Sequence, residues 1–259
     1  MIGLTKRHRQ PELMDAPDLN SQDHRQALIG LRRVNWWSGT AGILVTAIVR
    51  EFAGITGRVK ILDIASGGGD QVVEVTRRLV RQGLNVDVDG CDISSTAVAH
   101  ATDHAVRCGF SQREDGRLVC PEGGSADGTI HFFQTDVLAV APAAESYDVV
   151  MCTLFLHHLD EPQAMQLLNL MQKATRQLIL VDDLRRTRLG YLLAWAGCRL
   201  LTRCRIVHVD GPLSVQGAFT DSEVRNLARQ SGLDGIQLST HWPQRFLLSW
   251  RKPTCVRKS

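Results

Sequence analysis

The segment Val59-Lys-Ile-Leu-Asp-Ile-Ala-Ser-Gly-Gly-Gly-Asp70 decides the fold of this chain of 259 residues. Its Val-, Ile- and Leu-rich first half predicts a buried strand over 59–64, and the glycines predict a turn that leads into a helix over 71–82. Glycine adopts positive φ without strain and lets a ligand approach the backbone closely. Unpaired N–H groups at a helix N-terminus bind polar or anionic groups. The segment therefore predicts a strand–loop–helix cradle for a nucleotide-like ligand.

Two common nucleotide cradles do not match this loop. The dinucleotide fingerprint G-x-G-x-x-G needs a third glycine, and Val72 occupies that position. A P-loop ends in G-K-[ST], whereas Asp70 and Gln71 follow the glycines here. An acidic residue before the glycines, Asp63, also favours a cationic ligand over a pyrophosphate by Coulomb attraction.

Strands and helices alternate after this segment. Further strands are expected near 85–93, 129–137, 146–155 and 176–184, with helices between them, and residues 111–128 are expected to be a surface loop. Such alternation predicts an α/β fold with a doubly wound, mostly parallel sheet and helices on both faces. Ligands bind such sheets at the carboxyl ends of the strands. Asp63, Asp92 and Asp136 all lie on or at the ends of successive strands, and Asp92 is well placed to accept hydrogen bonds from a ribose diol.

Both ends of the chain depart from the alternation. Residues 1–20 are polar and are expected to be extended or frayed, and helical periodicity over 21–52 is interrupted at 35–39. We therefore divide the chain into an N-terminal helical cap, 1–55, and a main domain, 56–259. The stretch 185–205 is apolar and Arg-flanked and predicts one long helix, within an insertion over about 184–216. Two last strands, near 235–240 and 245–252, suggest a closing hairpin.

Composition narrows the class of protein. A formal net charge of +3 is too small to favour nucleic acid as a partner. Seven cysteines without C-x-x-C spacing argue against a disulfide framework and fit a reducing compartment. The N-terminus lacks the apolar core of a signal peptide, and there is no apolar run long enough to span a membrane. The expectation is a cytoplasmic protein, monomeric or homodimeric, without stable membrane insertion.

The glycine-rich segment resembles motif I of the class I S-adenosylmethionine-dependent methyltransferases, with Ala65 in place of the first glycine of the family pattern. The resemblance implies a seven-stranded Rossmann-like sheet and S-adenosylmethionine as the cofactor. In the family arrangement the turn holds the methionine end of the cofactor, Asp92 the ribose and Asp136 the adenine amino group, with Val137 against the ring. The implied cofactor-binding residues are Asp63, Ala65, Ser66, Gly67, Gly69, Asp92, Ile93, Asp136, Val137 and Thr153.

The sequence TLFLHHLDEP, starting at Thr153, resembles the motif of ubiquinone/menaquinone biosynthesis methyltransferases, in which this strand end lies under the reactive methyl. His157 and His158 are the catalytic candidates, because an ordinary histidine pKa near 6.5 suits a general base. The alternative is that one or both rings only orient the loop. Asp182-Asp183 resembles a magnesium site of catechol methyltransferases, but Thr153 stands where that site needs a carboxylate, so no metal is expected.

Aromatic and basic side chains are candidates for the acceptor pocket. Arg33, Trp36 and Trp37 could form one wall, with Phe155 at the strand end. The 185–205 helix has three interpretations: a packed helix of the fold, a lid whose Tyr191 and Trp195 (with Leu192 and Leu200) line the pocket, or a contact with an anionic membrane.

These observations predict methyl transfer to a small lipophilic acceptor, first of all to the hydroxyl of a phenolic, quinone-like or polyketide-derived compound. C-methylation of such a ring is the nearest alternative. A nucleic-acid or protein methyltransferase is opposed by the charge balance and by TLFLHH in the place of an Asn/Asp-Pro-Pro-Tyr-type motif. A cofactor-binding protein without catalysis remains the alternative from another class.

Overall fold

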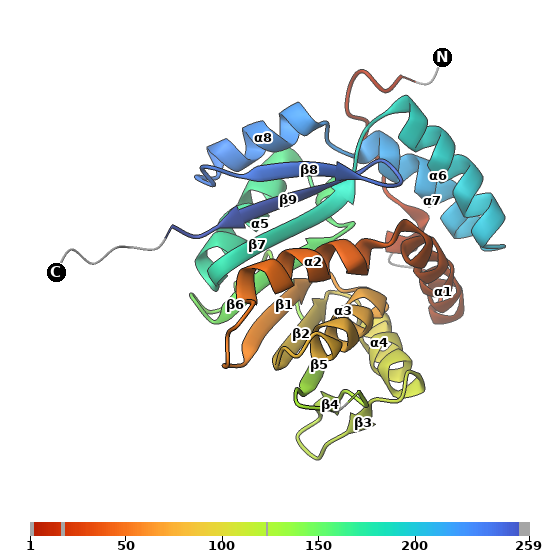
Figure 1. The fold of residues 1–259 in the computed structure, drawn as a ribbon. Helices are drawn as coiled ribbons and strands as arrows, with labels where there is room; N and C mark the ends of the chain where they lie inside the picture. The colour runs from red at the N-terminus through yellow and green to blue at the C-terminus, as the bar shows by residue number, and fades with distance from the viewer. Residues whose placement is uncertain (1–2, 17–18, 123, 254–259) are drawn as a thin grey trace.

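The computed structural model describes residues 3–16, 19–122 and 124–253. Its centre is a single twisted sheet with the strand order β3-β4-β5-β2-β1-β6-β7-β9-β8 (Figure 1). The strands β1, β2, β5, β6 and β7 run parallel, whereas β9 is antiparallel to β7 and to β8. Their bounds are β1 Val59–Ile64, β2 Val86–Asp92, β5 Gly128–Gln134, β6 Tyr147–Thr153, β7 Thr175–Leu184, β8 Gln237–His241 and β9 Arg245–Arg251. The predicted doubly wound α/β fold is confirmed.

The sheet has nine strands rather than the expected seven. The two additional strands, β3 (Ser111–Gln112) and β4 (Leu118–Val119), form a short antiparallel arm in the region expected to be a loop. The arm joins the edge of the sheet because Leu118 is buried and pairs with Ile130 of β5. Two residues per strand are too few to give a readable alternation in the sequence.

Helices cover both faces of the sheet. On one face lie α2 (Thr40–Phe52), α3 (Asp70–Arg81) and α4 (Ser95–Arg107), whose apolar residues pack with the strands into one core. On the other face lie α5 (Glu161–Ala174) and α8 (Asp221–Gln230), which share a second core. Strand β1 is buried along nearly its whole length, as expected for a central parallel strand covered on both faces.

A third group of helices lies beyond the carboxyl end of β7: α1 (Ser21–Ser38), α6 (Arg188–Leu201) and α7 (Arg205–Gly217) (Figure 1). The prediction of one helix over 185–205 is wrong. The backbone is extended at Thr202 (φ −142°, ψ 156°), which ends α6, and a second helix starts at Arg205. The interruption expected over 35–39 is confined to Gly39, which adopts φ 70° after α1 has continued through Ser38. Within the described residues, no helix is both long and apolar enough to cross a membrane.

The N-terminal segment is ordered against this group rather than frayed. It contains the short 3-10 helix η1 (Leu13–Asp15). The Arg7 side chain donates to the carbonyl oxygens of His157, Leu159 and Gly217 at 2.6–2.9 Å, so it ties the segment to α7 and to the loop after β6. A polar segment with no periodicity gave no sign of these contacts.

Candidate active site

A cavity of about 730 Å³ lies between the carboxyl ends of the central strands and the group formed by α1, α6, α7 and the N-terminal segment. Its volume is within the roughly 300–1,000 Å³ that is typical of ligand sites. Twelve of the residues expected from the sequence line it: Trp37, Ala65, Ser66, Gly67, Asp92, Ile93, Asp136, Val137, Thr153, Phe155, His157 and His158.

The glycine-rich loop forms the floor of one half of this cavity. Ala65 and Gly67 both have positive φ, 56° and 53°. The backbone N–H of Gly67 donates to Asp92 Oδ2 (2.9 Å), and the N–H of Ser94 donates to Asp92 Oδ1 (2.9 Å). Asp92, at the end of β2, therefore holds the loop after β1 in shape while it lines the cavity. Ser94 is the N-cap of α4, and its side chain accepts a hydrogen bond from the Ala97 N–H (3.2 Å).

Gly69 lies behind the loop and does not line the cavity. Its φ is 74°, and a Cβ there would lie 2.7 Å from Ala101 Cβ and 2.8 Å from the Phe132 ring. Its position is explained by close packing of α3 against α4 and β5, a role different from the cofactor contact implied by the resemblance.

Asp63 also lies outside the cavity lining, directly beneath the loop. Its carboxyl group is fully buried, and neither oxygen has a hydrogen-bond partner among the residues that the structure describes. Burial, together with the negative charges of Asp70 and Asp92, raises the pKa of Asp63 well above its usual range. Burial also raises the pKa of Asp70, which lines the cavity. The loop therefore concentrates three carboxyl groups, Asp63, Asp70 and Asp92, and the charge of Arg32 offsets only part of the effect of burial on Asp70.

Strand β6 ends at the centre of the cavity. Thr153 lines it, and Leu154 turns the chain with φ 52° while its N–H donates to the Asp182 carbonyl (2.9 Å). On the next side of the cavity, Val137 is buried, whereas Asp136 is exposed and accepts a hydrogen bond from the Leu138 N–H (2.9 Å).

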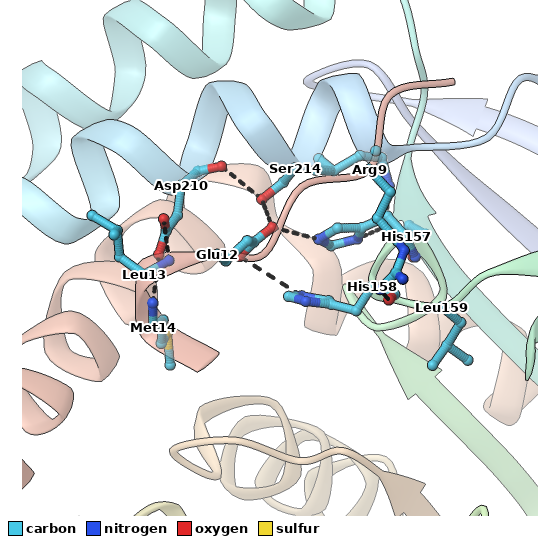
Figure 2. A network of polar contacts seen from close by, with 12 residues as sticks. Arg9, Glu12, Leu13, Met14, His157, His158, Leu159, Asp210 and Ser214 are labelled. Atoms are coloured by element: carbon cyan, nitrogen blue, oxygen red, sulfur yellow. Dashed lines mark hydrogen bonds and ion pairs between the residues drawn. The ribbon is translucent and has the colours of Figure 1, made fainter. Parts of the chain in front are cut away.

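His157 lies between two carboxylates, those of Asp183 and Glu12, and Figure 2 shows the side that faces Glu12. Its Nδ1 is 2.6 Å from Asp183 Oδ1, and its Nε2 is 3.6 Å from Glu12 Oε1. Burial opposes the charged form of the ring, but the two carboxylates outweigh burial and raise the pKa of His157 to about 10. The ring therefore already carries a proton at neutral pH. The interpretation of His157 as a general base with an ordinary pKa does not fit this geometry.

His158 is placed differently. Its side chain is 23% exposed, and its ring lies 4.3 Å from that of His157 and 6.4 Å from that of Phe155. Its Nε2 is 3.8 Å from Glu12 Oε2. Glu12, a residue that sequence reasoning missed, is thus shared by both histidines. No pattern in the sequence connects Glu12 to them, because the contact spans most of the domain.

The expected acceptor walls need correction. Arg33 is exposed and Trp36 is 80% exposed, so both point away from the cavity, whereas Trp37 lines it. Tyr191 and Trp195 on α6 do not line it either, and the Trp195 ring instead contacts the Arg199 guanidinium at 4.5 Å. The helix turns its smaller side chains inward: Gly190, Leu193, Ala194, Gly197, Cys198 and Leu201. The prediction that Tyr191 and Trp195 line the pocket therefore chose the face of α6 that is turned away from the cavity.

The Asp182–Asp183 pair is engaged in ion pairs. Asp182 is fully buried and pairs with Arg245 and with His241 Nε2, the latter at 2.6 Å. Asp183 holds His157, as described above. No Lys or Arg is found among the described residues that line the cavity, and the protonated His157 there is already paired with Asp183, so an acceptor with a carboxylate or phosphate would find no Lys or Arg partner.

Comparisons with known proteins find one matching family model and several solved structures with a similar fold. Residues 61–177 match the family model described as a methyltransferase domain. The fold is similar to that of human N-acetylserotonin methyltransferase in complex with S-adenosylmethionine (TM-score 0.58, 19% identity, 91% of this chain and 57% of that chain). It is similar to magnesium protoporphyrin IX methyltransferase from Synechocystis PCC 6803 with bound S-adenosylhomocysteine (0.53, 15%, 92% and 90%). It is also similar to the CMeT domain of the citrinin polyketide synthase (0.57, 13%, 83% and 52%).

The chain thus spans little more than half the length of two of these structures and most of the third. No curated protein is similar enough to the sequence to count as a match. The family match runs from within β1 to the start of β7 and includes the glycine-rich loop and the carboxyl ends of β1, β2, β5 and β6. Residues 61–177 of this chain match the methyltransferase-domain family model, and the chain has a fold similar to that of the three methyltransferase structures named above.

Proposed function

We propose that this protein transfers a methyl group from S-adenosylmethionine to the hydroxyl of a small, lipophilic and uncharged acceptor, of phenolic, quinone-like or polyketide-derived type. The product of the cofactor is S-adenosylhomocysteine.

The buried carboxyl groups around the glycine-rich loop carry the proposal. Within the described part of the chain, Asp63 has no hydrogen-bond partner, and it lies close enough to Asp70 and Asp92 for their charges to raise its pKa. A ligand that brings positive charge removes this repulsion, and S-adenosylmethionine carries both a sulfonium and an amino group. A pyrophosphate would add negative charge to the same place. The site therefore fits the methyl donor and opposes a nicotinamide dinucleotide.

The other half of the cavity supports a neutral acceptor. Its walls include Leu28, Leu31 and Val34 of α1 and Leu193 and Leu201 of α6. The lack of Lys and Arg among the described lining residues argues against a free acid as the acceptor. The helices α6 and α7, within the insertion at 184–216, would then be the outer wall of the acceptor site.

The protein's own residues would act mainly by positioning. When bound, S-adenosylmethionine supplies a methyl carbon on a sulfonium, and the acceptor oxygen bonds to that carbon as the carbon–sulfur bond breaks. His158, the more accessible of the two rings, would accept the hydroxyl proton. His157, already protonated, would hold Glu12 and Asp183 in place. Correct placement of two reacting groups can supply much of the rate enhancement.

Calorimetric titration with S-adenosylmethionine, and separately with NADH, tests the cofactor. Binding of the former alone at micromolar concentration is expected, and binding of NADH alone would overturn the proposal. Incubation with a panel of neutral phenols and matched aromatic acids, with release of S-adenosylhomocysteine measured by mass spectrometry, tests the acceptor. Turnover confined to the acids would overturn the uncharged acceptor, and cofactor binding without turnover on any acceptor would favour a non-catalytic binding protein.

Methylation of a ring carbon is the second candidate, because a similar fold is found in the CMeT domain of the citrinin polyketide synthase. The position of the new methyl group in the product, determined by NMR, separates the two reactions.

A further inference from the structure

We propose that Glu12, His157 and His158 form a binding site for one divalent transition-metal ion, represented by Zn²⁺. The two ring nitrogens and the carboxylate come together at one edge of the cavity, with their ligand atoms all within 4.8 Å of one another (Figure 2). They are the one such group among the residues that the structure describes.

The separations between these atoms suit an ion better than direct hydrogen bonds. His157 Nε2 lies 3.6 Å from one Glu12 oxygen, and His158 Nε2 lies 3.8 Å from the other. Both separations exceed the 2.7–3.2 Å or so of a hydrogen bond. Zinc–ligand bonds of about 2.0–2.2 Å in a tetrahedral arrangement separate neighbouring ligand atoms by about 3.4 Å. The two separations from Glu12 are close to this value, and the three ligand atoms together lie within 4.8 Å. Closing the site around the ion would bring the side chains together by up to about 1.4 Å.

A second layer of contacts orients His157 as a ligand. Its Nδ1 donates to Asp183 Oδ1 at 2.6 Å, and its backbone N–H donates to Asp183 Oδ2 at 3.0 Å. Asp183 is buried and belongs to β7. A carboxylate that accepts from the far ring nitrogen fixes the ring with Nε2 toward the metal, which is the usual arrangement of metal-binding histidines. The ion would displace to solvent the Nε2 proton that the ring carries in its absence.

Glu12 is held as firmly as the histidines. The Ser214 hydroxyl donates to Glu12 Oε1 (2.5 Å), and Ser214 lies on α7. On either side of Glu12, Arg9 donates to the His158 carbonyl (2.9 Å), and the N–H groups of Leu13 and Met14 donate to Asp210 at 2.9 and 3.0 Å. The third ligand is thus positioned by the fold before any ion arrives.

The ligand set selects the kind of metal. Two imidazoles and one carboxylate suit Zn²⁺ and its transition-metal neighbours, whereas Mg²⁺ and Ca²⁺ require mostly oxygen ligands. Three protein ligands leave at least one position open toward the cavity. An acceptor hydroxyl bound there would be polarised by the metal, which would replace His158 as the group that activates the hydroxyl.

Metal titration of the purified protein, after treatment with a chelator, tests the site. We expect one Zn²⁺ per chain by calorimetry and elemental analysis, no comparable binding of Mg²⁺, and a visible absorption band when Co²⁺ is added. His158→Ala and Glu12→Gln should each weaken Zn²⁺ binding about 100-fold or more, and Ser214→Ala about 10–100-fold. His131→Ala, whose ring stacks on Phe133 outside the cavity, is the matched control.

Circular dichroism of each variant shows whether it is folded. Absence of stoichiometric Zn²⁺ binding to the unaltered protein, or binding that is unchanged in both His158→Ala and Glu12→Gln, would overturn the proposal. Binding of S-adenosylmethionine is measured on the same chelator-treated protein. If Zn²⁺ does not bind but S-adenosylmethionine does, the metal proposal fails and the proposed methyltransferase function is unaffected.

Discussion

The two halves of the cavity are built in different ways. The half around the glycine-rich loop comes from the ends of neighbouring strands and from loops a few residues long, such as the one that Asp92 holds through Gly67 and Ser94. The half around the histidines joins segments that are far apart in the sequence: the N-terminal segment, the end of β6, Asp183 of β7 and Ser214 of α7. The first half depends on local backbone geometry. The second half depends on ion pairs and hydrogen bonds between side chains from distant segments. Substitutions should therefore affect ligand binding in the first half and the stability of the fold in the second.

The largest effect is expected from His157→Ala. It leaves the buried Asp183 carboxylate without its cation, and breaking a buried pair in this way typically costs about 3–5 kcal/mol. Urea denaturation of chelator-treated protein measures the loss of unfolding free energy. His158→Ala is the matched control and should cost about 1 kcal/mol, because its ring is partly exposed and does not contact Asp183. If both variants lost the same unfolding free energy, the claim that only His157 forms a stabilising buried ion pair would be contradicted.

The same ion pair predicts a loss of stability in alkali. The pKa of His157 is raised to about 10 in the folded protein, against about 6.5 in an unfolded chain. The stabilisation is therefore complete below about pH 6.5 and declines as the pH rises through about 10. Melting temperatures of chelator-treated protein between pH 7 and 10.5 should fall more steeply for the unaltered chain than for His157→Gln. Parallel curves would show that the ring is not charged.

In the loop half, Asp92→Asn should mainly weaken cofactor binding. Removal of the charged acceptor should cost about 1.5–3 kcal/mol of affinity for S-adenosylmethionine, or roughly 10–150-fold. Asp87→Asn, on the same strand but paired with Arg58 at its other end, is the control. Calorimetry measures both. An unchanged affinity of Asp92→Asn for S-adenosylmethionine would show that Asp92 does not bind the cofactor and only accepts the backbone hydrogen bonds of Gly67 and Ser94.

The smallest effect is expected at Ala65, which has φ 56°. Alanine pays a steric penalty in this left-handed region that glycine does not, so Ala65→Gly should raise stability by up to about 1 kcal/mol. Affinity for the cofactor should be equal or higher. Ala97→Gly, in the first turn of α4, is the opposite control and should destabilise by about 1 kcal/mol. A destabilising Ala65→Gly would show that the methyl group has a packing role of its own.

The contrast between the halves also explains what the sequence could predict. The bounds of β1 and the cavity positions of Ala65, Asp92 and Thr153 follow from short motifs. The end of α6 at Thr202, the arm of β3 and β4, and the contacts of Glu12 depend on packing between distant segments. Composition indicated apolar and aromatic residues on α6 but not which face of the helix they occupy, and so Trp195 was placed inside when it lies outside.

The contacts of the N-terminal segment have a consequence for the order in which the protein is made. Arg7 is joined to Gly217 across 210 positions of sequence, and domains fold from the N-terminal end as they leave the ribosome. The strand–loop–helix units from β1 to β7 can assemble while α7 is still being synthesised. The N-terminal segment is made before α7, yet its contacts with Ser214 and Gly217 can form only after α7 has been made.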